Sequence, residues 1–153
     1  MKKENLILFG ILALIIAGLG GGVALMHTRG FRNNNPGNLK AGPAWRGVVG
    51  VDRAGFAIFD TMENGVRALG KDLTAKMGRG LDTVREIINV YAPPSENPTS
   101  SYVAKVSEWL GVSPDAPLTS RDLPDLISAI IRFENGKTLD ARVINAGVAT
   151  MYA

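Results

Sequence analysis

The sequence predicts a mainly α-helical domain with one short β-hairpin, preceded by a single N-terminal transmembrane helix. Residues 6–26 contain no charged side chain, and about 20 apolar residues suffice to span a bilayer core as a helix. After residue 27, apolar side chains recur at helical spacing in several segments. Only residues 45–59 show two short extended pieces around a turn, at residues 52–55.

The N-terminal segment, residues 1–27, is predicted to be a membrane anchor, and residues 28–153 form the second domain. Lys2 and Lys3 precede the apolar run, as in a signal peptide, but no small-x-small cleavage site follows, which favours an uncleaved anchor. The run is diluted by glycine and alanine, which makes membrane insertion less secure. We therefore consider a signal-arrest-release segment, which leaves the membrane when the membrane depolarises, as a further hypothesis.

Composition argues against several classes of chemistry. The chain has no cysteine and one histidine, His27, directly beside the apolar run. A thiol nucleophile, a Ser-His-Asp triad and a His-ligated zinc hydrolase are therefore poorly supported. Residues 27–153 carry 15 basic and 13 acidic side chains without a basic stripe, so we predict no nucleic-acid partner. We predict no cofactor and no metal site, and carboxylates remain for acid–base catalysis.

The first segment of the second domain, residues 28–40, contains four asparagines together with Pro36 and Gly37. This composition predicts a loop or a string of turns with no regular element. Its amides offer donors and acceptors such as an N-acetyl sugar requires, although turn chemistry alone also accounts for them. Trp45, in the next segment, is expected to cover the core rather than to stack on a sugar.

The helices that follow have start and stop signals of their own. Residues 60–63 are expected to form a capping box, which gives Glu63 a structural role. Glu96 lies in a proline-bounded loop, where it is either a positioned polar group or a cap. The predicted helices cover residues 60–77, 83–92 before Pro93, 99–110 before Gly111, 123–135 and 139–148.

Glu134 occupies an unusual position in the helix at residues 123–135. Leu123, Ile127 and Ile130 form an apolar stripe, and the next place on that stripe is Glu134. Asn135 and Gly136 then end the helix. A carboxyl group at a helix C-terminus beside an apolar wall is disfavoured from ionising, so it is suited to donate a proton. The alternative is a solvated residue of the last turn, paired with a neighbouring cation.

A family of small phage-encoded cell-wall lytic proteins is resembled in three places: residues 29–40, residues 55–59 together with 65–69, and residues 91–99. Residues 126–136 look like the helix that carries the catalytic glutamate of soluble lytic transglycosylases. Tyr91 and residues 99–106 look like the tyrosine motif and the Thr-x-x-Tyr-Val-x-x-Val helix of that family. There the glutamate helix comes first, whereas here it comes last, which implies a circularly permuted lysozyme-like domain. Asn135 replaces the usual serine.

The resemblance implies a peptidoglycan-degrading enzyme that cleaves the β-1,4 bond between N-acetylmuramic acid and N-acetylglucosamine. It makes Glu134 the acid of a lytic transglycosylase. In a muramidase, the second alternative, Glu63 or Glu96 would be the second carboxylate. Further expected roles are substrate orientation by Tyr91 and Tyr102 and binding of N-acetyl groups by Asn33, Asn34 and Asn38.

The expected location follows from the anchor and the resemblance. Residues 6–26 would hold the protein in a membrane, with the lytic domain facing the cell wall, for host lysis or, in a membrane-containing virion, for entry. The opposing class is a non-catalytic virion or membrane protein that binds peptidoglycan with a lysozyme-like fold. A cleft-facing Glu134 favours the enzyme, and a solvated Glu134 favours the structural protein.

Overall fold

A computed structural model describes residues 28–42 and 44–153 of the chain. The predicted anchor, residues 1–27, lies outside the described residues. Within the described ranges, no helix is both long and apolar enough to cross a membrane. The described elements are mainly helices: α1 (Arg29–Arg32), β1 (Val48–Val51), β2 (Ala57–Phe59), α2 (Met62–Gly78), α3 (Val84–Tyr91), α4 (Thr99–Leu110), the 3₁₀ helix η2 (Ser120–Asp122), α5 (Leu123–Asn135) and α6 (Ala141–Ala149).

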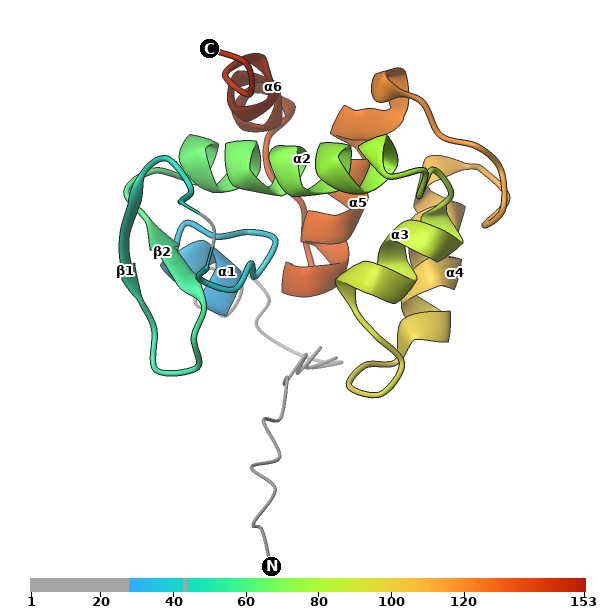
Figure 1. Ribbon diagram of the computed structural model, residues 1–153, viewed down its shortest axis with the longest axis horizontal. Coiled ribbons are helices and arrows are strands. Elements are labelled where there is room, and N and C mark those ends of the chain that lie inside the picture. Colours follow the sequence, from blue (N-terminus) through green and yellow to red (C-terminus); the bar gives the residue numbers. More distant parts are fainter. Residues whose placement is uncertain (1–27, 43) are drawn as a thin grey trace, which may run out of the picture.

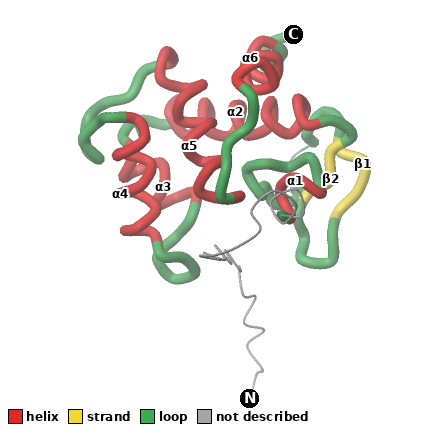
Figure 2. Tube along the Cα trace, turned by 180° about the vertical axis from the view of Figure 1, so that it is seen from behind, coloured by secondary structure: helices red, strands yellow, loops and turns green. Residues whose placement is uncertain are grey.

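Helix α5 lies at the centre of this domain. On one side of it are α1 and the β1–β2 hairpin, and on the other side are α3 and α4 (Figure 1). The same arrangement is visible from behind in Figure 2. Helix α2 passes across α5 and also packs against α6. The fold therefore has two lobes, with α2 and α5 between them.

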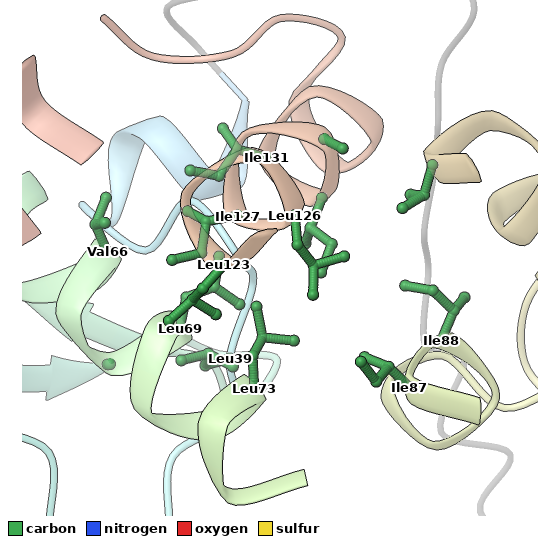
Figure 3. Close-up of a cluster of buried hydrophobic side chains, with 14 of the residues drawn as sticks. Leu39, Val66, Leu69, Leu73, Ile87, Ile88, Leu123, Leu126, Ile127 and Ile131 are labelled. Carbon is green, nitrogen blue, oxygen red and sulfur yellow. The ribbon is translucent and has the colours of Figure 1, made fainter. Parts of the chain in front are cut away.

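The hydrophobic core joins α2 to α5. Ile127 and Ile130 of α5 and Leu69 and Leu73 of α2 are completely buried. Figure 3 shows Leu69 and Leu73 of α2 facing Leu123 and Ile127 of α5, with Ile87 and Ile88 pointing toward this cluster from α3. Burial of apolar area is the main stabilising contribution to such a fold. The predicted stripe of α5 is thus confirmed as a core face.

Most predicted helix boundaries are confirmed. Thr83 and Glu86 form the capping box of α3, and Gly111 ends α4 with a φ of 69°. The predicted cap of α2 is wrong. Thr61, rather than the box of residues 60–63, accepts the N–H of Asn64 at 3.2 Å. The Asp60 carboxylate is instead held by the Asn64 side chain at 2.8 Å, and Glu63 remains an acidic residue of the first turn.

The asparagine-rich segment differs in one respect from the expected string of turns. Its first residues, Arg29–Arg32, form one turn of helix, α1, because Thr28 caps them by accepting the N–H of Phe31. The turns follow from Asn33 onward. The expected hairpin is confirmed: β1 and β2 are antiparallel, with Val48 opposite Phe59 and Val51 opposite Ala57.

One close approach fixes the asparagine segment against α2. A side chain at Gly65 would overlap the carbonyl oxygen of Asn34, so this turn of α2 requires a glycine. Asn34 itself has a positive φ of 48°, a conformation that asparagine tolerates better than most residues. The segment therefore lies directly on the helix that also supports α5.

Candidate active site

Helix α5 carries Glu134 to a cleft between the two lobes. The cleft has a volume of about 400 Å³ and is lined on one wall by residues of the segment 29–40 and by Phe56, and on the other by residues 90–97. Glu134 is one of the lining residues, and part of its surface is exposed. Two residues further on, Gly136 caps the end of the helix with a φ of 79°. Glu134 therefore faces the cleft and not open solvent.

Both oxygens of the Glu134 carboxylate are held by side chains from other elements. Asn38 Nδ2 donates to Oε2 at 2.8 Å, and the Tyr102 hydroxyl donates to Oε1 at 2.9 Å. Burial raises the pKa of Glu134, whereas these two donors and the positive charge of Arg29 lower it by smaller amounts. The Glu134 carboxyl group therefore keeps its proton to a higher pH than an ordinary glutamate does. When it ionises, Asn38 and Tyr102 already donate hydrogen bonds to the carboxylate.

Two tyrosines form the aromatic side of the site. The ring of Tyr102 stacks on that of Phe133, with the two ring centroids 3.7 Å apart. The rings of Tyr91 and Tyr102 meet edge to face, with their centroids 6.4 Å apart. Burial, and then the negative charge of Glu134, raises the pKa of both hydroxyl groups well above the usual value. Both tyrosines therefore act as neutral donors at any physiological pH.

Tyr91 connects the two walls of the cleft. Its hydroxyl donates to the carbonyl oxygen of Gly37. A side chain at Gly37 would come within 2.8 Å of this hydroxyl and 2.9 Å of Leu69, so only glycine fits there. The turn that precedes Asn38 is thus pressed between α2 and α3, and this places the Asn38 amide at Glu134. Asn38 adopts a positive φ of 49° to reach it.

The cleft also contains charged groups apart from Glu134. Lys76 and Asp72 of α2 form an ion pair at 2.6 Å. Glu96 lies on the opposite wall and is exposed. Arg29 and Lys40 lie on the wall that carries Asn38, next to Phe56. In the described ranges there is no group of three or more His, Asp or Glu side chains that could hold a metal ion.

Comparison with known proteins relates the chain to a phage protein. No protein-family model matches the chain. The chain is 35% identical over 148 residues to Protein P5 of Pseudoalteromonas phage PM2, covering 89% of this chain and 88% of that protein. The chain belongs to the family of this phage protein. The match spans nearly the whole length of both chains, so it includes most of the domain described above.

The structure brings some predicted site residues together and places others elsewhere. Asn38, Tyr91, Tyr102 and Glu134 form one connected group. Glu96 lines the same cleft but belongs to the wall opposite Asn38. Glu63 lies outside the cleft, in a separate hollow beside α6. Of the three carboxylates predicted for catalysis, Glu134 and Glu96 therefore line the cleft, and Glu63 does not.

Asn33 and Asn34 also lie outside the lining of the cleft. The Asn33 amide donates to the Asp52 carboxylate at 2.9 Å, and the Asn34 amide donates to the carbonyl oxygen of Phe59 at 3.1 Å. Their donors thus hold the hairpin to the asparagine segment. Trp45 is partly buried against the core and is absent from the cleft lining, in agreement with the expected core role.

Sequence reasoning missed the structural role of two asparagines. Asn35 is completely buried and bonds to Leu39 and Ala57. Asn135 is buried beside Glu134, donates to the carbonyl oxygen of Pro36 at 2.7 Å and accepts the Thr28 hydroxyl at 2.8 Å. In the sequence, Asn135 before Gly136 indicates only the end of a helix. Its neighbouring residues give no sign that its partners, Thr28 and Pro36, lie about 100 residues away in the chain.

Proposed function

We propose that this protein cleaves the β-1,4 bond between N-acetylmuramic acid and N-acetylglucosamine in peptidoglycan, with Glu134 as the general acid. The observation that carries the proposal is the state of Glu134: a cleft-facing carboxyl group whose pKa is raised by burial. A general acid needs a pKa near the working pH, and burial is the usual means of raising that of a glutamate. The resemblance to lytic transglycosylases and to phage lytic proteins supports the same assignment.

The surroundings of Glu134 suit both halves of a transglycosylase reaction. In the first step, the Glu134 carboxyl gives its proton to the glycosidic oxygen as the bond to C1 of the muramyl residue breaks. The carboxylate that remains is stabilised by the donors Asn38 and Tyr102. In the second step it takes the proton of the muramyl 6-hydroxyl, whose oxygen bonds to C1 and closes a 1,6-anhydro ring. This sequence needs neither a second carboxylate nor a water molecule.

The muramidase alternative requires a second carboxylate across the scissile bond. Among the candidates, Glu63 is outside the cleft, and Asp72 is neutralised by Lys76. Glu96 is the remaining acidic residue of the lining, on an exposed loop. These placements favour the transglycosylase. The cleft-facing position of Glu134 likewise favours an enzyme over a purely structural peptidoglycan-binding protein.

The test is digestion of purified peptidoglycan by the full-length chain and by Glu134→Gln, with mass spectrometry of the released fragments. We expect anhydro-muropeptides from the wild type and a loss of about 10³-fold in Glu134→Gln, which is in the range for removal of a general acid. Glu63→Gln is the matched control and should retain activity. Reducing muramyl ends would establish a muramidase, and no fragments from a folded wild type would support the structural protein.

We also propose that the protein acts at the cell wall of a bacterial host of a phage. The support is the relation to a phage protein together with the predicted anchor at residues 6–26, which remains a prediction. Membrane fractionation before and after collapse of the membrane potential distinguishes a permanent anchor from a signal-arrest-release segment. Only a released segment would move the protein from the pellet to the soluble fraction.

A further inference from the structure

Asn135, the residue directly after Glu134, is buried although its side chain is polar. It is only 3% exposed. Its Nδ2 donates to the carbonyl oxygen of Pro36 at 2.7 Å and to that of Ile131 at 3.0 Å. Its Oδ1 accepts the Thr28 hydroxyl at 2.8 Å. Both partners of Nδ2 are carbonyl oxygens, which can only accept, so the orientation of the amide group is fixed.

Helix α1 closes over this amide group. A Cβ at Gly30 would lie 2.3 Å from Asn135 Oδ1 and 3.1 Å from the carbonyl oxygen of Asn35. The Gly30 carbonyl oxygen in turn accepts the N–H of Asn35 at 2.8 Å. The Asn135 side chain is therefore enclosed between α1, the end of α5 and the turn that begins at Pro36.

That turn leads from Asn135 to the donor that binds the acid. Asn135 holds the carbonyl oxygen of Pro36, and two residues further along the chain Asn38 Nδ2 donates to Glu134 Oε2 at 2.8 Å. Glu134 and Asn135 are neighbours in α5. The two hydrogen bonds and these two short pieces of chain thus form a closed ring. A shift of the turn relative to the end of α5 breaks at least one of the two bonds.

The Asn38 side chain depends on its backbone for its position. Its Oδ1 is buried and has no hydrogen-bond partner within residues 28–42 and 44–153. Its backbone N–H donates to the carbonyl oxygen of Asn35 at 2.9 Å. Tyr91 holds the neighbouring carbonyl oxygen, that of Gly37. An amide whose only side-chain bond goes to Glu134 is directed by the turn that carries it, so the contacts of the turn decide where it donates.

We propose that Asn135 is a positioning residue of the site: it fixes the turn at Pro36 so that Asn38 donates to Glu134. The contribution of this contact to catalysis rests on the proposed function of Glu134 as the general acid. The contact itself does not, because it consists of hydrogen bonds within the protein.

The groups that act on Glu134 make this role measurable. Burial raises the pKa of Glu134, and the donors Asn38 and Tyr102 and the charge of Arg29 lower it. The two tyrosines of the site stay neutral. Loss of the Asn38 donor removes one of the influences that lower the pKa, so the pKa of Glu134 should rise further. If Asn135 only stabilised the fold, its removal would lower stability without this rise.

The first measurement is an NMR titration of the Glu134 carboxyl carbon in the full-length chain, kept in detergent, with Glu134→Gln to assign the signal. We expect a higher pKa of Glu134 in Asn135→Ala, as in Asn38→Ala. The double variant should show no rise beyond that of Asn38→Ala, because Asn135 acts through Asn38. Ile130→Val is the matched control. It removes buried packing from the same helix without a polar contact and should leave the pKa unchanged.

An unchanged pKa of Glu134 in Asn135→Ala, or an equal rise when Asn135→Ala is added to Asn38→Ala, would overturn the positioning role. Circular dichroism melting shows whether each variant is folded. If Asn135→Ala does not fold, Thr28→Val replaces it. This variant is similar in size and removes only the hydroxyl that donates to Asn135. It should raise the pKa by a smaller amount, and an unchanged pKa would then overturn the role.

The second measurement is peptidoglycan cleavage by the same variants over a range of pH. In Asn135→Ala we expect a rate about tenfold lower, as for loss of one hydrogen bond to the carboxylate formed in the reaction. The alkaline limb of the pH profile should move up, because an acid of higher pKa keeps its proton to higher pH.

The two measurements separate the positioning role from the proposed function. A rise in the pKa of Glu134 without any fragment released by the wild type leaves the positioning contact standing and removes the catalytic proposal. Cleavage by the wild type that Asn135→Ala reduces no more than Ile130→Val does, with an unchanged pKa, leaves the proposed function standing and removes the positioning role.

Discussion

The two walls of the cleft are built in different ways. In the wall at residues 29–40, Asn35 is completely buried, and its amide donates to the carbonyl oxygens of Leu39 and Ala57, both at 2.9 Å. In the wall at residues 90–97, the Asn97 amide donates to the carbonyl oxygen of Pro93 at 3.2 Å in a partly buried bond, and residues 94–96 are exposed. Fully buried side-chain bonds to the backbone are more costly to lose than partly buried ones. We therefore expect the wall at residues 29–40 to be the firmer of the two.

Replacing an asparagine by alanine on each wall should give the largest difference in the free energy of unfolding. Asn35→Ala leaves the buried N–H of Leu39 and the carbonyl oxygen of Ala57 without their side-chain partner, so we expect a loss of about 3 kcal/mol in the free energy of unfolding. Asn97→Ala should cost less than about 1 kcal/mol. Urea denaturation with an unchanged m-value measures both. Equal losses would contradict the difference between the walls.

Removal of the connection between the walls should have an intermediate effect. Tyr91→Phe keeps the ring and removes the hydroxyl that donates to the carbonyl oxygen of Gly37, for an expected loss of about 1 kcal/mol. Because that turn positions Asn38, peptidoglycan cleavage should also decrease. Urea denaturation and the digestion assay measure the two effects. Unchanged cleavage in a destabilised Tyr91→Phe would show that Asn38 is positioned by other contacts.

The carboxyl group between the walls should change stability in a pH-dependent way. Burial raises the folded-state pKa of Glu134 above its unfolded value, so the folded state binds the proton more tightly. The stabilisation is fully present below the unfolded pKa of about 4.3. It is lost as the pH rises through the folded pKa. Urea denaturation of wild type and Glu134→Gln at several pH values should therefore show the variant gaining relative stability as the pH rises. A difference that falls with pH would contradict a raised pKa.

The smallest effect is expected at the exposed wall. Glu96→Gln should change the rate of peptidoglycan cleavage by less than about threefold, because a transglycosylase needs no second carboxylate. Glu63→Gln, a carboxylate outside the cleft, provides the comparison. Fragment release followed by mass spectrometry measures both rates. A loss of about 10²-fold in Glu96→Gln alone would mean that Glu96 acts in the chemistry and that the proposed activity is that of a muramidase.

Local sequence signals determined the helices. The capping box at Thr83, the glycines that end α4 and α5 and the stripe of Leu123, Ile127 and Ile130 each act within a few residues, so they can be read directly from the chain. The same signals placed Glu134 at the end of a buried helix. The one-turn helix α1 was missed, because a single capping residue, Thr28, forms it within a segment whose composition favours turns.

The tertiary structure decided which polar residues form the site. Asn38 lies 96 residues from Glu134 in the sequence and Tyr102 lies 32 residues from it, and no local pattern encodes such pairs. Four asparagines in one short segment look alike in the sequence, yet three of them hold backbone or hairpin groups and only Asn38 reaches the acid. Leu69 of α2 and Tyr91 of α3 pack against Gly37, and this packing positions Asn38 rather than another asparagine beside Glu134. The sequence alone therefore determined where the acid lies along its helix, and the meeting of distant segments determined its burial, its partners and its pKa.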